Sequence, residues 1–208
     1  MPATAQENKD GVITGIIGTS LGVGLVYCGY HYLPIAPPRV THPSDHLLYA
    51  IKCQLPMIVF LVVSVMRVLM GRMAFGAMHA LQPARDKEHA ENFEVRRRIV
   101  ENSVQQFVIA APAQWILALY LAPAQLKMIP ALVVHWVVSR IVYSHGYLRD
   151  TKDRLGRGLG FNMIFNIQMF LVGYLVYRYV TEFMSATQGV SGLPVNPGMP
   201  GMPGKPGM

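Results

Sequence analysis

The sequence contains five apolar stretches of about twenty residues each, separated by polar segments. A helix rises 1.5 Å per residue, so about twenty residues cross the roughly 30 Å hydrocarbon core of a bilayer. Backbone groups cannot stay unpaired in lipid, so each stretch must be a helix. The five stretches are residues 11–33, 47–66, 99–121, 128–148 and 159–177. We therefore predict an all-α, multi-pass integral membrane protein with five spans in the lipid bilayer.

Charge patterning predicts how the chain is oriented. Only 14% of the residues are charged, whereas soluble domains carry about 25%. The net charge is +7, but the basic residues stand beside the apolar spans, which indicates membrane orientation and not nucleic-acid binding. The basic connectors 71–98 and 149–158 would share one side of the membrane, and we expect that side, with the N-terminus, to be cytoplasmic. The compartment is expected to be the endomembrane system (endoplasmic reticulum, Golgi or secretory vesicles) or the plasma membrane.

Composition divides the chain into four segments. Residues 1–10 form a polar N-terminus, residues 11–33 an additional transmembrane helix, and residues 46–183 a four-helix membrane domain. Residues 184–208 form a low-complexity tail rich in glycine, proline and methionine. From residue 198 the tail has glycine at every third position, as in collagen, but four repeats are too few to be stable alone. We expect this tail to be disordered.

Cysteine and histidine give no sign of a metal site. Cys28 and Cys53 both fall inside apolar spans, where they are expected to pack as small apolar side chains. His42 and His46 are four residues apart, and His31 lies on the same side of the membrane. No fourth ligand follows at a fixed spacing, so we predict no metal.

The first polar cluster opens the third predicted span and consists of Arg98, Asn102 and Gln105. The spacing i, i+4, i+7 places all three on one helical face. Polar groups inside a membrane span are costly, so each marks a candidate functional site. The alternative is structural, because asparagine and glutamine also join membrane helices by hydrogen bonds.

A second polar cluster closes the fourth predicted span and consists of Arg140, Tyr143, Tyr147 and Arg154. Steps of three, four and seven place these residues on one face, provided that the helix continues through Gly146. Two tyrosines at a membrane boundary also suit an aromatic belt, and the arginines suit the positive-inside rule. The third and fourth helices are joined by a short turn, so the two clusters could face each other in a basic pocket. Arginine binds carboxylates bidentately, so such a pocket would suit a small anionic ligand.

Two motifs in these clusters resemble those of the MAPEG family, the membrane-associated proteins of eicosanoid and glutathione metabolism. Residues 98–105, RIVENSVQ, resemble the family pattern Arg-x-x-x-Asn-x-x-Glu. Residues 139–149, SRIVYSHGYLR, resemble Ala-Arg-x-x-Tyr-x-x-Gly-Tyr. Residues 125–130 and 156–161, together with the additional first span, resemble the mattrin branch of that family.

The resemblance implies a MAPEG-like four-helix bundle plus one N-terminal helix, assembled as a homotrimer with glutathione bound between subunits. The implied catalytic residue is Arg154, which would stabilise the glutathione thiolate by lowering the thiol pKa. The implied glutathione-binding residues are Arg98, Asn102, Gln105, Arg140, Tyr143, Tyr147 and Arg149.

Gln105 departs from the family pattern, which has glutamate at this position. Glutamine can still hydrogen-bond, but it cannot pair with an ammonium group or with a neighbouring arginine. Two hypotheses therefore stay open. One is a non-catalytic or weakly catalytic member of the mattrin type, acting in membrane or epithelial trafficking or interaction. The other is a glutathione-dependent transferase or peroxidase that acts on lipophilic electrophiles.

Overall fold

The computed structural model describes the chain except for residues 1–4, 37, 39, 41, 75–86, 150–153 and 192–208. The side chains of residues 5–10, 74, 87–92, 154–157 and 186–191 are also outside the described part. The predicted tail thus lies mostly outside the described residues, as does the side chain of Arg154. The elements are α1 (Ala5–Tyr32), α2 (Pro43–Cys53), α3 (Leu55–Ala74), α4 (Lys87–Tyr120), η1 (Pro123–Gln125), α5 (Met128–Arg149) and α6 (Arg154–Ser191).

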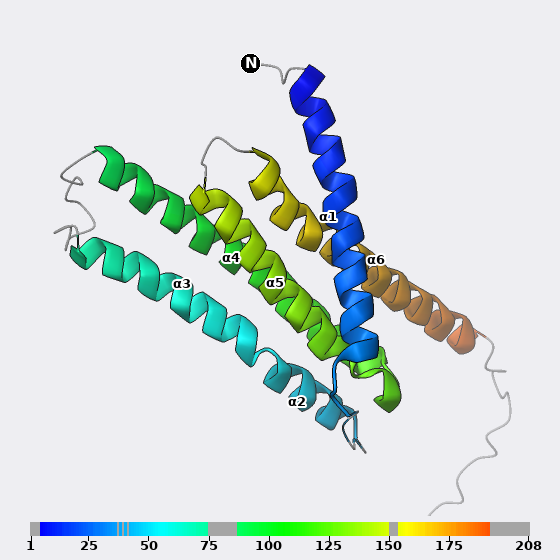
Figure 1. Ribbon diagram of the computed structural model, residues 1–208. Coiled ribbons are helices and arrows are strands. Elements are labelled where there is room, and N and C mark those ends of the chain that lie inside the picture. Colours follow the sequence, from blue (N-terminus) through cyan, green and yellow to red (C-terminus); the bar gives the residue numbers. More distant parts are fainter. Residues whose placement is uncertain are drawn as a thin grey trace, which may run out of the picture.

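The predicted all-α membrane fold is confirmed. Four candidate spans are long and apolar enough to cross a membrane, namely Gly11–Tyr32, Pro43–Met73, Pro123–Arg149 and Gly158–Ser185. The third predicted span falls in α4, which is not among the four, because residues such as Gln105, Gln106 and Gln114 lower its hydropathy. α4 nevertheless lies antiparallel to α3 and α5 in the bundle (Figure 1). The count of five spans therefore stays a prediction.

The bundle carries many large apolar side chains on its outer surface. Val59 of α3, Val108 of α4 and Phe170 of α6 are all more than half exposed. Such a surface would be an aggregation hazard in water, whereas in a bilayer these side chains contact lipid. The predicted short turn between the third and fourth helices is confirmed as η1 with its flanking residues, and α5 continues through Gly146 as predicted.

The second predicted span is divided between two helices, α2 and α3, that meet at Gln54. Pro56 has no N–H to continue the helical ladder, which accounts for a break at this point. The Gln54 side chain is buried and its Nε2 donates a hydrogen bond of 3.2 Å to the carbonyl oxygen of Ala111 in α4. The break therefore also joins α2 and α3 to α4.

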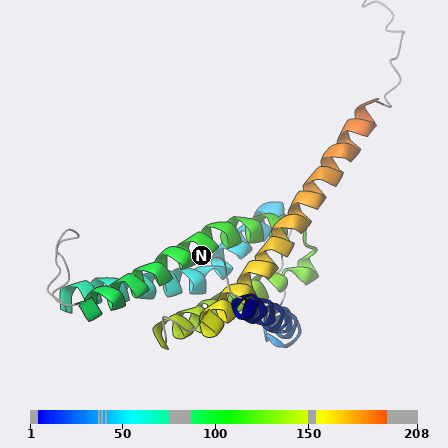
Figure 2. The same ribbon diagram turned by 90° about the horizontal axis from the view of Figure 1, so that it is seen from above.

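The N-terminal helix α1 packs across α5 and α6, on the side of the bundle away from α4 (Figure 2). Gly22 allows the close approach, because a Cβ there would lie 2.5 Å from the carbonyl oxygen of Met163 in α6. Beside this contact the Asn166 amide donates a hydrogen bond of 2.5 Å to the Thr19 hydroxyl. The additional helix is thus attached by close packing and by a polar contact within the membrane region.

The centre of the bundle is an aromatic cluster around Trp136 of α5, which is 1% exposed. Phe60 of α3 and Phe107 of α4 both contact it edge-on, with ring centroids 5.7 and 6.3 Å away. These contacts hold α3, α4 and α5 together about one turn of α5 before the polar residue Arg140. In Figure 1, α1, α4 and α6 begin toward one end of the bundle. α3 and α5 end toward that same end.

Candidate functional site

Arg140 of α5 is the centre of the polar site. Its side chain is fully buried, with 0% of the residue exposed. Its Nη1 donates a hydrogen bond of 2.6 Å to Asn102 Oδ1 of α4, and its Nη2 donates one of 3.4 Å to the carbonyl oxygen of Gly160 in α6. The guanidinium also lies 4.7 Å from the centroid of the Tyr143 ring. One charged side chain therefore links three helices.

The approach of α6 to Arg140 depends on Gly160. A Cβ at this position would collide with the backbone of Tyr143, 2.6 Å from its Cα. The absent side chain lets the Gly160 carbonyl reach the arginine. The Nε of Arg140 is buried and has no hydrogen-bond partner among the described residues. The arginine is thus held by two hydrogen bonds and one aromatic ring.

Tyr143 and Tyr147 continue the site toward the end of α5. Their ring centroids are 5.6 Å apart, and both residues are buried. Ile99 of α4 completes this small cluster, with Val95 and Phe161 packed against it. The predicted face of α5 is therefore confirmed as a buried face, and Gly146 does not interrupt it.

Arg98 lies at the rim of this cluster and belongs to a charged network on α4. Arg98 Nε and Arg97 Nε donate hydrogen bonds of 2.8 and 2.9 Å to the two carboxylate oxygens of Glu94. These bonds, first from Arg97 and then from Arg98, lower the pKa of Glu94 to about 2. The pKa of Arg98 is raised by the hydrogen bond to Glu94 and, next, by a hydrogen bond with Tyr147. Arg98 therefore connects the two motifs.

The predicted site residues are only partly brought together. Asn102, Arg140, Tyr143 and Tyr147 lie in one cluster between α4, α5 and α6, with Arg98 at its rim. Gln105 is exposed on the outer face of α4, and Arg149 is exposed at the end of α5. The side chain of Arg154, the predicted catalytic residue, lies outside the described part. The roles of all these residues in binding or catalysis stay predictions.

Sequence reasoning missed a second group of buried polar residues. Gln168 Nε2 of α6 donates a hydrogen bond of 3.0 Å to the Gln106 carbonyl oxygen of α4. The ring nitrogen Nε2 of His135 lies 3.0 Å from the carbonyl oxygen of Met163. The signal was present in the sequence, because each residue is a polar side chain inside an apolar stretch. What the sequence lacked was the partner, which in each case is a backbone carbonyl.

Comparison with known proteins assigns the chain to a family. The model of the MAPEG family matches residues 48–177. The chain belongs to the MAPEG family. The match covers most of α2 and all of α3, α4 and α5, together with most of α6, and it leaves out α1.

Two relatives share the MAPEG region. Transmembrane protein 79 (mattrin) of Mus musculus is 29% identical over 163 residues, which is 76% of this chain and 39% of that protein. The Bos taurus protein of the same name is 28% identical over 163 residues, 76% of this chain and 38% of that protein. The chain therefore spans only about two fifths of the length of these MAPEG relatives. No solved structure gives a significant match to it.

Proposed function

We propose that this protein is a non-catalytic or weakly catalytic MAPEG member that acts in membrane trafficking or interaction through its contacts with other membrane proteins. The observation that carries the proposal is the position of Arg140. Its guanidinium is buried and hydrogen-bonded to Asn102 and to the Gly160 carbonyl. A ligand that recruited Arg140 or Asn102 would have to break bonds that hold three helices together.

The residue type at position 105 supports the same proposal. Gln105 is exposed on the outer face of α4, on which we place the subunit interface below. The exchange of a family glutamate for glutamine removes from that interface an anionic group that could fix an ammonium group of glutathione. The remaining motif residues then serve chiefly as helix-packing contacts.

The rival function is a glutathione-dependent transferase or peroxidase. It is favoured by Arg98, whose guanidinium lies at the rim beside Tyr147 and could take a carboxylate in place of Glu94. Arg154 would supply the charge that stabilises a thiolate. We rank this function second because Arg140 and Asn102, which would bind glutathione, are already hydrogen-bonded within the protein.

Calorimetric titration of glutathione into the purified protein separates the two functions. We expect no binding heat at millimolar glutathione, for the wild type and for Gln105→Glu alike. If the Gln105→Glu variant bound glutathione and the wild type did not, the rest of the site would be intact. The glutamine at position 105 would then be the reason that the wild type does not bind. Binding by the wild type would support the rival function and contradict our proposal.

We further propose that the protein assembles as a homotrimer through the outer face of α4. Gln105 and Val108 are exposed on this face, as is Ile116 two turns further on. Gln105 is the seventh residue of the third predicted span, so its amide would stand about 10 Å inside the apolar region. An amide exposed to lipid is costly, and a neighbouring subunit could satisfy it by an interhelical hydrogen bond.

A further inference from the structure

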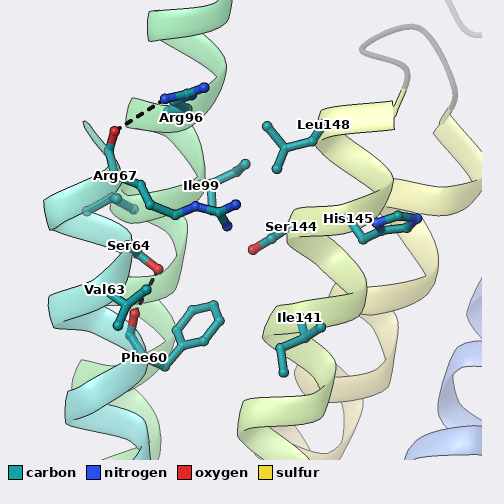
Figure 3. Close-up of a pocket in the computed structure, with 11 residues that line it drawn as sticks. Phe60, Val63, Ser64, Arg67, Arg96, Ile99, Ile141, Ser144, His145 and Leu148 are labelled. Carbon is teal, nitrogen blue, oxygen red and sulfur yellow. Dashed lines mark hydrogen bonds between the residues drawn. The ribbon is translucent and has the colours of Figure 1, made fainter. Parts of the chain in front are cut away.

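A second cavity lies between α3, α4 and α5, and it is separate from the Arg140 site. It encloses about 260 Å³ (Figure 3). Ser144 and His145 of α5 line it, whereas Arg140, Tyr143 and Tyr147 do not. The cavity adjoins the Arg140 site at Ile99 of α4, which lines the cavity and also packs with Tyr143 and Tyr147. The cavity therefore involves neighbouring residues of the same helices and none of the predicted glutathione-binding residues.

One part of this cavity is apolar. Phe60 and Val63 of α3 line it on one side, and Ile141 of α5 lines it on the other. Figure 3 shows these three side chains at the same level of the bundle, toward its centre. Phe60 also contacts Trp136, so this wall belongs to the rigid aromatic cluster. Such a surface suits the hydrocarbon chain of a lipid.

The other part of the cavity is basic. Arg67 of α3 and Arg96 of α4 line it, whereas the His145 ring of α5 points away from it (Figure 3). Arg96 Nη1 donates a hydrogen bond of 3.3 Å to the carbonyl oxygen of Arg67, which leaves the Arg67 guanidinium itself available. No acidic side chain lines the cavity, and no ion pair with Arg67 occurs among the described residues. The described lining of the cavity thus presents positive charge and no carboxylate.

Ser144 supplies an independent indication of a ligand. Its Oγ is buried and has no hydrogen-bond partner among the described residues. In Figure 3 the Ser144 hydroxyl and the Arg67 guanidinium point toward each other across the cavity, from α5 and from α3. A buried hydroxyl without a partner is costly. A phosphate oxygen between the two groups would satisfy both.

The depth of the cavity also fits a lipid headgroup. Arg67 follows the predicted span 47–66 and lies six residues before the end of the candidate span Pro43–Met73, so its long side chain can extend toward the headgroups. Basic pockets between membrane helices at this level commonly hold the headgroups of anionic lipids. A zwitterionic headgroup fits less well, because its ammonium group would find no carboxylate among the described lining residues.

We propose that this cavity binds one anionic phospholipid. Its phosphate lies between Arg67 and Ser144, with Arg96 adding positive charge. Its acyl chain runs along Phe60, Val63 and Ile141. The site is independent of the proposed function and of glutathione.

Native mass spectrometry of the protein in mild detergent tests the lipid site, with phosphatidylglycerol as the probe and phosphatidylcholine and inorganic phosphate as comparisons. We expect phosphatidylglycerol to remain bound at activation energies that remove phosphatidylcholine. Arg67→Gln should weaken the binding of phosphatidylglycerol about tenfold or more, as expected for the loss of a charge-assisted hydrogen bond. Ser144→Leu, which fills the cavity, should also abolish retention.

The matched control is Arg72→Gln, which makes the same change of charge on the same helix. Arg72 does not line the cavity, and its guanidinium lies over the Phe93 ring. The affinity of the Arg72→Gln variant for phosphatidylglycerol should stay within about twofold of wild type. Equal losses for Arg67→Gln and Arg72→Gln would show diffuse attraction to the basic surface and overturn the site. Competition by inorganic phosphate at equal concentration would also overturn it, since the ligand would then be the free ion. Melting temperatures measured without lipid show whether each variant is folded.

Discussion

The Arg140 guanidinium of α5 donates a hydrogen bond of 2.6 Å to Asn102 Oδ1 of α4, and both residues lie in the region that the MAPEG family model matches. A cation buried between membrane helices is costly unless it is paired or hydrogen-bonded. Here the amide of Asn102 and the carbonyl of Gly160 supply those bonds. The pair therefore connects the two predicted motifs by a direct hydrogen bond between α4 and α5.

Removing either member of this pair should destabilise the bundle. In a double-mutant cycle with Arg140→Met and Asn102→Ala, we expect a coupling energy of about 1.5–3 kcal/mol, as for a hydrogen bond to a charged group. Thermal or denaturant unfolding in detergent measures it. The control cycle is Arg178→Met with Glu182→Ala, an exposed pair 3.1 Å apart, which should give at most about 1 kcal/mol. A coupling energy near zero for the buried pair would show that Arg140 is held by other contacts.

Gly160→Ala should separate α5 from α6. The added methyl group would collide with the backbone of Tyr143, so we expect a loss of about 1–3 kcal/mol in unfolding free energy. Gly173→Ala on the same helix is the matched control, because nothing lies within 4 Å of its Cβ position. That control should be neutral or stabilising by up to about 1 kcal/mol. Equal melting temperatures for the two variants would show that the close approach of α6 to α5 does not require glycine at position 160.

The same comparison on α1 tests how the N-terminal helix is attached. Gly22→Ala should loosen α1 from α5 and α6, because its methyl group would meet the Met163 carbonyl and the His135 ring. Gly24→Ala should leave the packing unchanged, since its Cβ position is open. Hydrogen–deuterium exchange of residues 157–170 would report the loosening. Equal exchange in the two variants would contradict this packing.

The charged network at the start of α4 should depend on pH. The pKa of Glu94 is lowered by Arg97 and Arg98 to about 2, below the value of 4.5 expected without these partners. A group with a lowered pKa in the folded state stabilises the protein above its unfolded pKa and loses that effect as the pH falls through the folded value. The Glu94 contribution should therefore be complete above about pH 5 and disappear toward pH 2. Carboxyl NMR of labelled Glu94 would follow this, and a titration midpoint near 4.5 would exclude the network.

Homotrimer formation through α4 can be tested by cross-linking. A cysteine replacing Gln105 should form a disulfide or a short cross-link between subunits in native membranes, because three copies of this face would meet. Phe170→Cys is the control, since this residue is 77% exposed on α6 and lines a groove with Tyr27 of α1, away from Gln105 and Val108. Cross-linking from position 170 but not from 105 would place the interface elsewhere.

Much of the fold follows from the sequence because its dominant signal is the length of apolar runs. That signal located α1, α5 and α6 and the short turn before α5. It treated residues 47–66 as one continuous span, although Pro56 marked the break at Gln54. Contacts such as Thr19 with Asn166 could not be predicted, because 147 positions separate the two residues and helix periodicity carries no information on their pairing.

The site was predicted less completely, for a geometric reason. A helix turns by about 100° per residue, so Asn102 and Gln105 lie about 40° and 20° to opposite sides of Arg98. The difference of about 60° is enough to direct Asn102 toward Arg140 and Gln105 toward the outside. Spacing placed the three on one face, but which edge of that face turns inward depends on how α4 packs against α5.

The central claim is that the shared motifs hold helices together here and do not activate a thiol. Ultraviolet difference spectroscopy of the purified protein with millimolar glutathione tests it most directly, because a stabilised thiolate absorbs and a free thiol does not. We predict no thiolate band in the wild type and no difference between the wild type and Arg154→Ala. A band in the wild type that Arg154→Ala removes would contradict the claim and establish a glutathione enzyme.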